Sequence, residues 1–266
     1  MADKAPSYED AALQHGELPS RPAPPPQKRG PFPLDIPVLN VLKRKRVILA
    51  SQSPSRKRIL GTIFPHMEIL PSTKPENLSK EELGPFQYVL QTATMKCLDV
   101  YSTALANSLA SIPDPACVIA ADTIAVTTSG KILEKPRSER EHIAMLKMLR
   151  DQRVHKSFTA VVVLAPREDA RAPGYNIETT VEETQVYFAD VEDVFIEAYV
   201  RTREGVDKAG GYGLQGLGSL LVEKIEGQAD NVMGLPLRAA LGLVERAVLN
   251  QDGGEEEVED GDGDEE

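Results

Sequence analysis

Short apolar runs alternate with longer amphipathic stretches through the middle of the chain, which predicts strands and helices in alternation. Apolar runs at 47–49, 67–70 and 117–123 have the length of buried strands. The stretch from Glu82 to about Leu109 carries apolar residues at helical spacing. The pattern predicts an α/β domain.

The second half of the chain continues this alternation. Ser138, with Glu141 three residues later, has the pattern of a capping box and predicts a helix to about Arg150. The remaining predicted elements are strands over 158–165 and 180–189, a helix over 193–203, a strand over 219–225, a turn over 231–236 and a closing helix over 237–249.

Both ends of the chain lack a globular pattern. Nine of the twenty prolines fall in the first forty residues, with few apolar residues between them. Ten acidic residues and no basic residue follow from Asp252 onward. We therefore predict a disordered proline-rich leader over 1–37, one domain over 38–250 and a disordered acidic tail over 251–266.

The tail accounts for most of the net charge of −11, and the rest of the chain carries about −1. A domain with so little net charge is not expected to attract nucleic acid through its electrostatic field. Cys97 and Cys117 are expected to be free thiols, and no apolar run reaches the roughly 18 residues of a membrane span. We expect a cytoplasmic protein, although the basic cluster 43–46 fits either a nuclear address or an exposed strand entrance.

A serine-rich turn joins the first strand to a helix that opens at Ser53-Pro54 and carries Ile59 to about Phe64. Serine as N-cap followed by proline is typical of a helix start. Unpaired backbone N–H groups, the hydroxyls of Ser51 and Ser53, and Arg56 in the first turn outline an anion site. In the alternative interpretation Ser-Pro only starts a helix and Arg56 is solvated.

Asp122 follows a fully apolar strand and is the best single candidate for chemistry. Polar residues at the carboxyl ends of buried strands commonly line the ligand crevice of open α/β sheets. Alternatively, Asp122 caps a turn through Thr123. A turn at Ser129-Gly130 would make a hairpin that brings Lys135 back toward Asp122.

Residues 207–218 form a second dense motif, with five glycines in nine residues. Glycine permits close approach of the backbone to a ligand. Asp207 and Lys208 offer a charge pair, and Gln215 offers an amide able to read a base edge. The segment matches neither a dinucleotide fingerprint nor a P-loop, and a mobile loop is the alternative.

Taken in chain order, these motifs resemble the Maf family of nucleoside triphosphate pyrophosphatases, in its dTTP/UTP branch. The resemblance covers about 38–248. The matching blocks are 49–54 (Leu-Ala-Ser-Gln-Ser-Pro), 121–123 (Ala-Asp-Thr), 130–136, 145–159, 207–216 and 232–236 (Val-Met-Gly-Leu-Pro).

The resemblance implies an elongated mixed twisted sheet with flanking helices and two lobes around a cleft, similar to the inosine-triphosphate pyrophosphatases. It also implies hydrolysis of a nucleoside triphosphate to monophosphate and pyrophosphate with a divalent metal, usually Mg2+, and a homodimer. The implied general base is Asp122, and the implied metal positions are Glu76 and Asp122. Implied phosphate contacts are the turn Ser51 to Ser53, Arg56, Lys96 and Lys135, and implied specificity positions are Ser55, Thr123 and Gln215.

The chain departs from the family pattern after the proline. Ser55-Arg56 stands where the family has two consecutive arginines, and Arg58 stands where it has a glutamate. The loss of one cation bears on substrate affinity. Two other functions stay open: a non-catalytic nucleotide-binding regulator of cell division, and a pyrophosphatase that clears other non-standard nucleotides.

Overall fold

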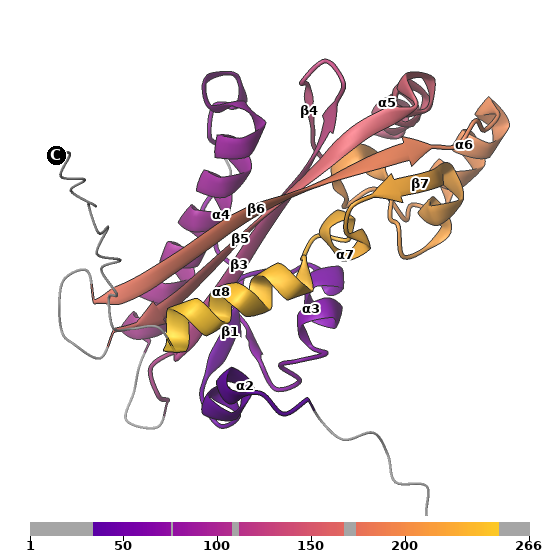
Figure 1. Cartoon of the computed structure of the whole chain (residues 1–266). Coiled ribbons are helices and arrows are strands. Elements are labelled where there is room, and N and C mark those ends of the chain that lie inside the picture. The colour runs from indigo at the N-terminus through magenta and orange to yellow at the C-terminus, as the bar shows by residue number, and fades with distance from the viewer. Residues whose placement is uncertain (1–33, 76, 108–111, 168–173, 250–266) are drawn as a thin grey trace, which may run out of the picture. The chain divides into compact units, whose positions relative to one another are not determined.

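The structure is a computed structural model that describes residues 34–75, 77–107, 112–167 and 174–249 (Figure 1). Its helices are α2 (Pro37–Leu42), α3 (Pro54–Leu60), α4 (Lys80–Ala106), α5 (Glu139–Gln152), α6 (Asp193–Arg201), α7 (Ala229–Val232) and α8 (Leu237–Leu249). Its strands are β1 (Val47–Leu49), β2 (Glu68–Ile69), β3 (Cys117–Thr127), β4 (Ile132–Leu133), β5 (Val154–Pro166), β6 (Tyr175–Phe188) and β7 (Val222–Glu226), and two 3-10 segments are η1 (Ala209–Gly211) and η2 (Leu217–Leu221).

The described strands form one mixed sheet of seven strands in the order β2-β1-β3-β5-β6-β7, with β4 paired to β3. Strand β1 lies parallel to β2 and β3, whereas β3, β5, β6 and β7 pair antiparallel. The long strands β3, β5 and β6 run side by side through the molecule, and Figure 1 shows α4 and α8 on opposite sides of them. The mixed α/β sheet with flanking helices is confirmed.

The first lobe is built on two hydrophobic cores, one on each face of the sheet. Cys117, Ile119 and Ala121 of β3 pack into the core that α2, α3 and α8 cover. Val118 and Ala120 pack into the core against α4. Because both faces are covered, the strand reads as a continuous apolar run and not as an alternating one.

The second lobe surrounds the other half of β3, β5 and β6. Helices α5 and α6 and the residues around β7 share a third core that includes Leu146, Phe188, Ile196 and Leu221. The predicted start of helix α5 is confirmed, since Ser138 Oγ accepts the backbone N–H of Glu141 at 3.1 Å. The two lobes are therefore joined by continuous strands, and not by a linker.

Several predicted boundaries differ from the structure. Helix α3 ends at Leu60, and Gly84, at φ 66°, interrupts α4 near its start. The turn predicted over 231–236 instead begins inside α7. The strands predicted over 158–165 and 180–189 correspond to β5 and β6, which are longer than predicted. Their polar ends also pair with each other, so the ladder extends beyond the apolar run.

Residues 219–221, which we predicted as the start of a strand, belong to the 3-10 turn η2 (Leu217–Leu221). Its backbone N–H groups at Leu217 and Gly218 donate to the Glu204 carboxylate and not to a neighbouring strand. Helix α2 begins at Pro37, where the leader was predicted to end. The rest of the leader, residues 1–33, and the tail from residue 250 lie outside the described residues.

Candidate active site

A cleft of about 920 Å3 lies where the two lobes meet. The serine-rich turn after β1 lines one side, and the glycine-rich segment between α6 and η2 lines the other. Asp122, Lys96 and Lys135 lie between them. Every predicted site residue that the structure describes contributes to the lining of this cleft; Glu76 lies outside the described residues.

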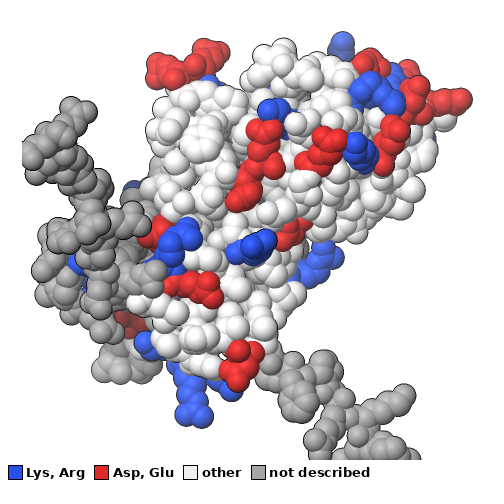
Figure 2. Space-filling view, viewed as in Figure 1, with Lys and Arg blue, Asp and Glu red and all other residues white. Residues whose placement is uncertain are grey.

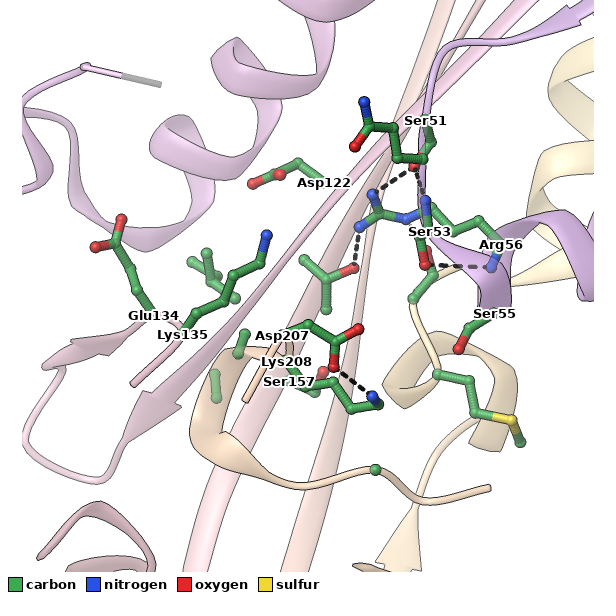
Figure 3. Close-up of a pocket in the computed structure, with 18 of the residues that line it drawn as sticks. Ser51, Ser53, Ser55, Arg56, Asp122, Glu134, Lys135, Ser157, Asp207 and Lys208 are labelled. Carbon is green, nitrogen blue, oxygen red and sulfur yellow. Dashed lines mark hydrogen bonds and ion pairs between the residues drawn. The ribbon is translucent and has the colours of Figure 1, made fainter. Parts of the chain in front are cut away.

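The serine-rich turn is held by Arg56 (Figure 3). Its guanidinium donates from Nε to the carbonyl of Gly234 at 2.8 Å, from Nη1 to Ser51 Oγ at 3.3 Å and from Nη2 to Thr123 Oγ1 at 2.9 Å. Ser53 is the N-cap of α3, since its Oγ accepts the N–H of Arg56. Arg56 is thus half-buried and bonded to three segments, so the interpretation of a solvated arginine is wrong.

Asp122 sits inside strand β3 and not at its end. The strand continues to Thr127, and Asp122 faces Ala160 of β5 in the register. The alternative role as a turn cap is therefore excluded, as is our prediction that the strand ends in this carboxylate. Asp122 is near the cleft because the sheet passes between the lobes at this point.

Lys96 of α4 pairs with Asp122. The distance between Nζ and Oδ1 is 2.7 Å, and the side chains are 12% and 10% exposed. Both residues were predicted at the site, but their contact was not. The cleft therefore contains a nearly buried ion pair between a strand and a helix.

The predicted hairpin is confirmed. Ala125 pairs with Leu133 and Val126 with Ile132, so the chain returns along β3 and places Lys135 at the cleft, near Asp122 in Figure 3. The hairpin also brings Glu134, which sequence analysis missed.

Glu134 is tied to α4. Its Oε1 accepts the hydroxyl of Tyr88 at 3.2 Å, and its Oε2 lies 2.7 Å from Nζ of Lys80. Tyr88 also lines the cleft and was not predicted. Glu134 could have been predicted at the cleft because it directly precedes Lys135. Tyr88 could not, because its position in the sequence is typical of the apolar face of a helix.

The glycine-rich segment is packed and not a free loop at its centre. Gly210 and Gly211 are buried with φ of 76° and 77°, a conformation that favours glycine. Lys208 Nζ lies 2.6 Å from Asp207 Oδ1, which confirms the predicted charge pair. Gln215 donates from Nε2 to Ser55 Oγ, so the two lobes touch across the cleft at two predicted specificity positions.

Tyr212 anchors this segment beneath the cleft. Its hydroxyl lies 2.9 Å from His155 Nε2, and both rings pack edge-on against Phe188. Burial lowers the pKa of His155 to about 4 and raises the pKa of the Tyr212 hydroxyl well above its usual range. Both groups are therefore neutral near pH 7 and form a structural support.

The described lining of the cleft has too few ligating side chains to hold a metal ion by protein groups alone. Within 34–75, 77–107, 112–167 and 174–249, no three His, Cys, Asp or Glu side chains group as a metal site. Carboxylates of Asp122 and Glu134 do line the same cleft. Mg2+ commonly takes one or two carboxylates and completes its shell with phosphate oxygens and water. A cleft with this few carboxylates is therefore compatible with Mg2+ bound together with a phosphate ligand.

Two further expectations can be compared with the structure. Among the described helices, none is long and apolar enough to cross a membrane. Cys97 and Cys117 are buried free thiols, as expected, and burial raises the pKa of both.

The model of the Maf-like protein family matches residues 46–247. A dTTP/UTP pyrophosphatase of Schizosaccharomyces pombe is 44% identical over 232 residues, covering 86% of this chain and 94% of the relative. One from Dictyoglomus turgidum is 38% identical over 203 residues, covering 76% and 96%.

A human relative is longer. It is described as a probable bifunctional dTTP/UTP pyrophosphatase/methyltransferase protein, and it is 39% identical over 202 residues, 76% of this chain and 32% of its own length. A solved nucleoside-triphosphatase / dITP/XTP pyrophosphatase from Mycobacterium abscessus aligns over 76% of this chain and 95% of its own, with a TM-score of 0.36 and 11% identity. The family match and the identities to the sequence relatives establish that this chain belongs to the Maf-like protein family.

Proposed function

We propose that this protein is a nucleoside triphosphate pyrophosphatase that hydrolyses dTTP and UTP to the monophosphate and pyrophosphate. The observation that carries the proposal is the convergence of Asp122, three cationic side chains and Gln215 on one cleft of a Maf-like chain. The relatives from yeast and bacteria that carry the dTTP/UTP name support the choice of substrate.

The charges of the cleft suit a triphosphate. Lys96 pairs with Asp122, Lys135 lies near Asp122 in Figure 3, and Arg56 lines the same cleft. Cations neutralise the charge that develops on the leaving pyrophosphate, which is the main requirement of phosphoryl chemistry. We assign these contacts to Lys96, Lys135, Arg56 and the hydroxyls of Ser51 and Ser53.

Asp122 is assigned as the general base. A water molecule adds to the α-phosphorus, its proton passes to the Asp122 carboxylate, and the bond from that phosphorus to the bridging oxygen breaks, so that pyrophosphate leaves. The carboxylate reaches water once the phosphates attract Lys96 away from it. With this role, Asp122 should contribute about 10²-fold or more to the rate of hydrolysis.

Base recognition is assigned to the far side of the cleft. Gln215 carries both a donor and an acceptor, and its amide is held by Ser55. Thr123 bonds Arg56 and lies 3.0 Å from the hydroxyl of Thr159, so it is fixed in place. Asp207 and Lys208 complete the substrate contacts from the glycine-rich segment.

We include a divalent cation, Mg2+, in the proposal, with Asp122 and Glu76 as its protein ligands. The support is that Asp122 and Glu134 contribute carboxylates to the lining of the cleft, whereas Glu76 lies outside the described residues. When bound, such an ion neutralises phosphate charge and lowers the pKa of a coordinated water.

We also propose that the protein acts in the cytoplasm, as a homodimer, without binding nucleic acid. Two buried free thiols suit a reducing compartment. The face in Figure 2 carries charges of both signs interspersed, which offers no broad basic surface for nucleic acid. Light scattering of the purified chain tests the dimer.

The experiment that tests the function is pyrophosphate release from dTTP, UTP and 7-methyl-GTP with Mg2+. The proposal predicts release from dTTP and UTP at rates well above that from 7-methyl-GTP. Binding of dTTP without release of pyrophosphate would instead favour a non-catalytic regulator.

A further inference from the structure

The Glu204 carboxylate lies at the centre of the turn that carries the glycine-rich segment. Its Oε2 accepts the N–H of Leu217 at 2.8 Å, and its Oε1 accepts the N–H of Gly218 at 2.8 Å. The hydroxyl of Tyr199 donates to Oε1 at 3.3 Å. One side chain thus holds two backbone groups and a tyrosine.

The two ends of this segment are also bound to Glu204 and its neighbours. The backbone carbonyl of Glu204 accepts Nζ of Lys208 at 2.7 Å. The hydroxyl of Tyr199 accepts the N–H of Gly213 at 3.2 Å. Because Lys208 and Gly213 flank the buried centre of the segment, Glu204 and Tyr199 hold the chain on both sides of that centre.

The sequence of the segment is adapted to this carboxylate. A Cβ on Gly216 would clash with Oε2 of Glu204, and one on Gly218 would lie 2.6 Å from the backbone of Gly213. Arg203, just before Glu204, has φ 63°, which is unfavourable for a residue with a side chain. The close packing around the Glu204 carboxylate therefore requires glycine at 216, and Glu204 itself follows a residue, Arg203, with an unfavourable backbone conformation.

This arrangement reaches the cleft through Gln215. Gln215 precedes Gly216, and its amide bonds Ser55 on the opposite side of the cleft. Lys208 lines the cleft as well. Gln215 and Lys208 are two of the polar side chains that the segment brings to the cleft. Both are positioned by Glu204, which does not itself line the cleft.

We propose that Glu204 is a positioning residue for nucleotide recognition, which holds Gln215 and Lys208 at the geometry that binds the substrate. The inference deepens the proposed function and rests on it. Glutamine is the sharpest replacement, because it keeps the size of the side chain but puts an N–H donor where Leu217 or Gly218 also donates.

The test measures the Kd of a non-hydrolysable α,β-imido analogue of dTTP with Mg2+, together with KM and kcat for dTTP. Glu204→Gln should raise Kd and KM about 10-fold or more and change kcat by less than about 3-fold. In a Gln215→Ala background the same substitution should raise Kd by no more than about 3-fold, because part of its effect acts through Gln215. A purely structural role would not produce this coupling.

Glu197→Gln is the matched control. Glu197 lies on α6 and its carboxylate is 3.6 Å from Lys147, away from the segment. The Glu197→Gln variant should bind the dTTP analogue with the Kd of the wild type. If Glu204→Gln does not fold, Gly216→Ala presses a methyl group onto the same carboxylate and should give the same rise in Kd.

Two results would overturn the inference: a folded Glu204→Gln or Gly216→Ala variant with wild-type Kd, or a rise in Kd of equal size with and without Gln215. Failure of the proposed function is a different result. In that case the wild type releases no pyrophosphate from dTTP, whatever its Kd.

Discussion

The ammonium group of Lys96 lies 2.7 Å from Oδ1 of Asp122 and joins helix α4 to strand β3 inside the cleft. A triphosphate that enters the cleft offers Lys96 a second anionic partner. The pair therefore links substrate binding to the release of the carboxylate that we assign as the base. We therefore assign Lys96 a role in the proposed chemistry as well as in the stability of the fold.

Lys96→Met should lower kcat/KM about 10²-fold and also destabilise the protein by about 3 kcal/mol, because it leaves a nearly buried carboxylate without its cation. Pyrophosphate release and urea unfolding measure the two effects. The control is Lys156→Met, which removes an ion pair of equal length, 2.7 Å to Glu183, whose side chains are 45% and 38% exposed. That surface pair should contribute at most about 1 kcal/mol. Equal losses for both variants would refute the special role of Lys96.

Arg56→Lys should fail to replace the arginine although it keeps the charge. The guanidinium makes three directed bonds, to Gly234, Ser51 and Thr123, and an ammonium on a flexible stem cannot reproduce them. We expect a loss of about 2 kcal/mol in unfolding free energy and at least a 10-fold loss in kcat/KM. Lys57→Ala, at an exposed position of the same helix, should leave both quantities near wild type. A fully active Arg56→Lys enzyme would contradict this account.

Ser55→Ala removes the acceptor that holds the Gln215 amide. One hydrogen bond at a partly exposed site contributes about 1 kcal/mol, so KM for dTTP should rise about 3- to 10-fold while kcat stays near wild type. Steady-state kinetics with dTTP and CTP would also show reduced discrimination between the two bases. An unchanged KM would mean that Ser55 and Gln215 do not act together on the nucleotide.

The buried histidine of the second lobe should make stability depend on pH. Burial lowers the pKa of His155 to about 4, against about 6.5 in an unfolded chain. Between these values the unfolded state binds a proton that the folded state does not, so stability falls as the pH drops from 6.5 to 4 and is fully present above 6.5. The loss from this residue should be about 2 kcal/mol by pH 4.5.

Urea unfolding of the wild type and His155→Gln at pH 7 and pH 4.5 checks this expectation. Glutamine can still bond the hydroxyl of Tyr212 but does not titrate. The wild type should lose about 2 kcal/mol more than the variant over this range. Parallel losses would show that His155 does not titrate as its burial implies.

Local sequence signals predicted much of this molecule. Ser53 and Ser138 mark helix starts because a hydroxyl cap acts within three residues. The buried run at 117–121 predicted β3, and the turn at Gly130, with φ 83°, predicted the hairpin that returns Lys135 to the cleft. Each of these features depends on neighbours in the chain.

Features that depend on distant contacts were missed. No local pattern shows that Asp122 pairs with Lys96 in mid-strand, or that Tyr88 and Glu134 meet in the cleft. Residue Glu204 was not recognised, because its carboxylate acts on backbone groups thirteen and fourteen positions later. Tertiary hydrogen bonding also turned the predicted strand start at 219–221 into a 3-10 turn.

The central claim is that Asp122 supplies the base for hydrolysis in this cleft, and Asp122→Asn tests it most directly. The asparagine keeps the shape of the side chain but cannot take a proton from water. We predict that kcat for pyrophosphate release from dTTP falls about 10²-fold or more, while the Kd of the non-hydrolysable analogue changes by less than about 3-fold. Release of pyrophosphate by the folded variant at the wild-type rate would contradict the account.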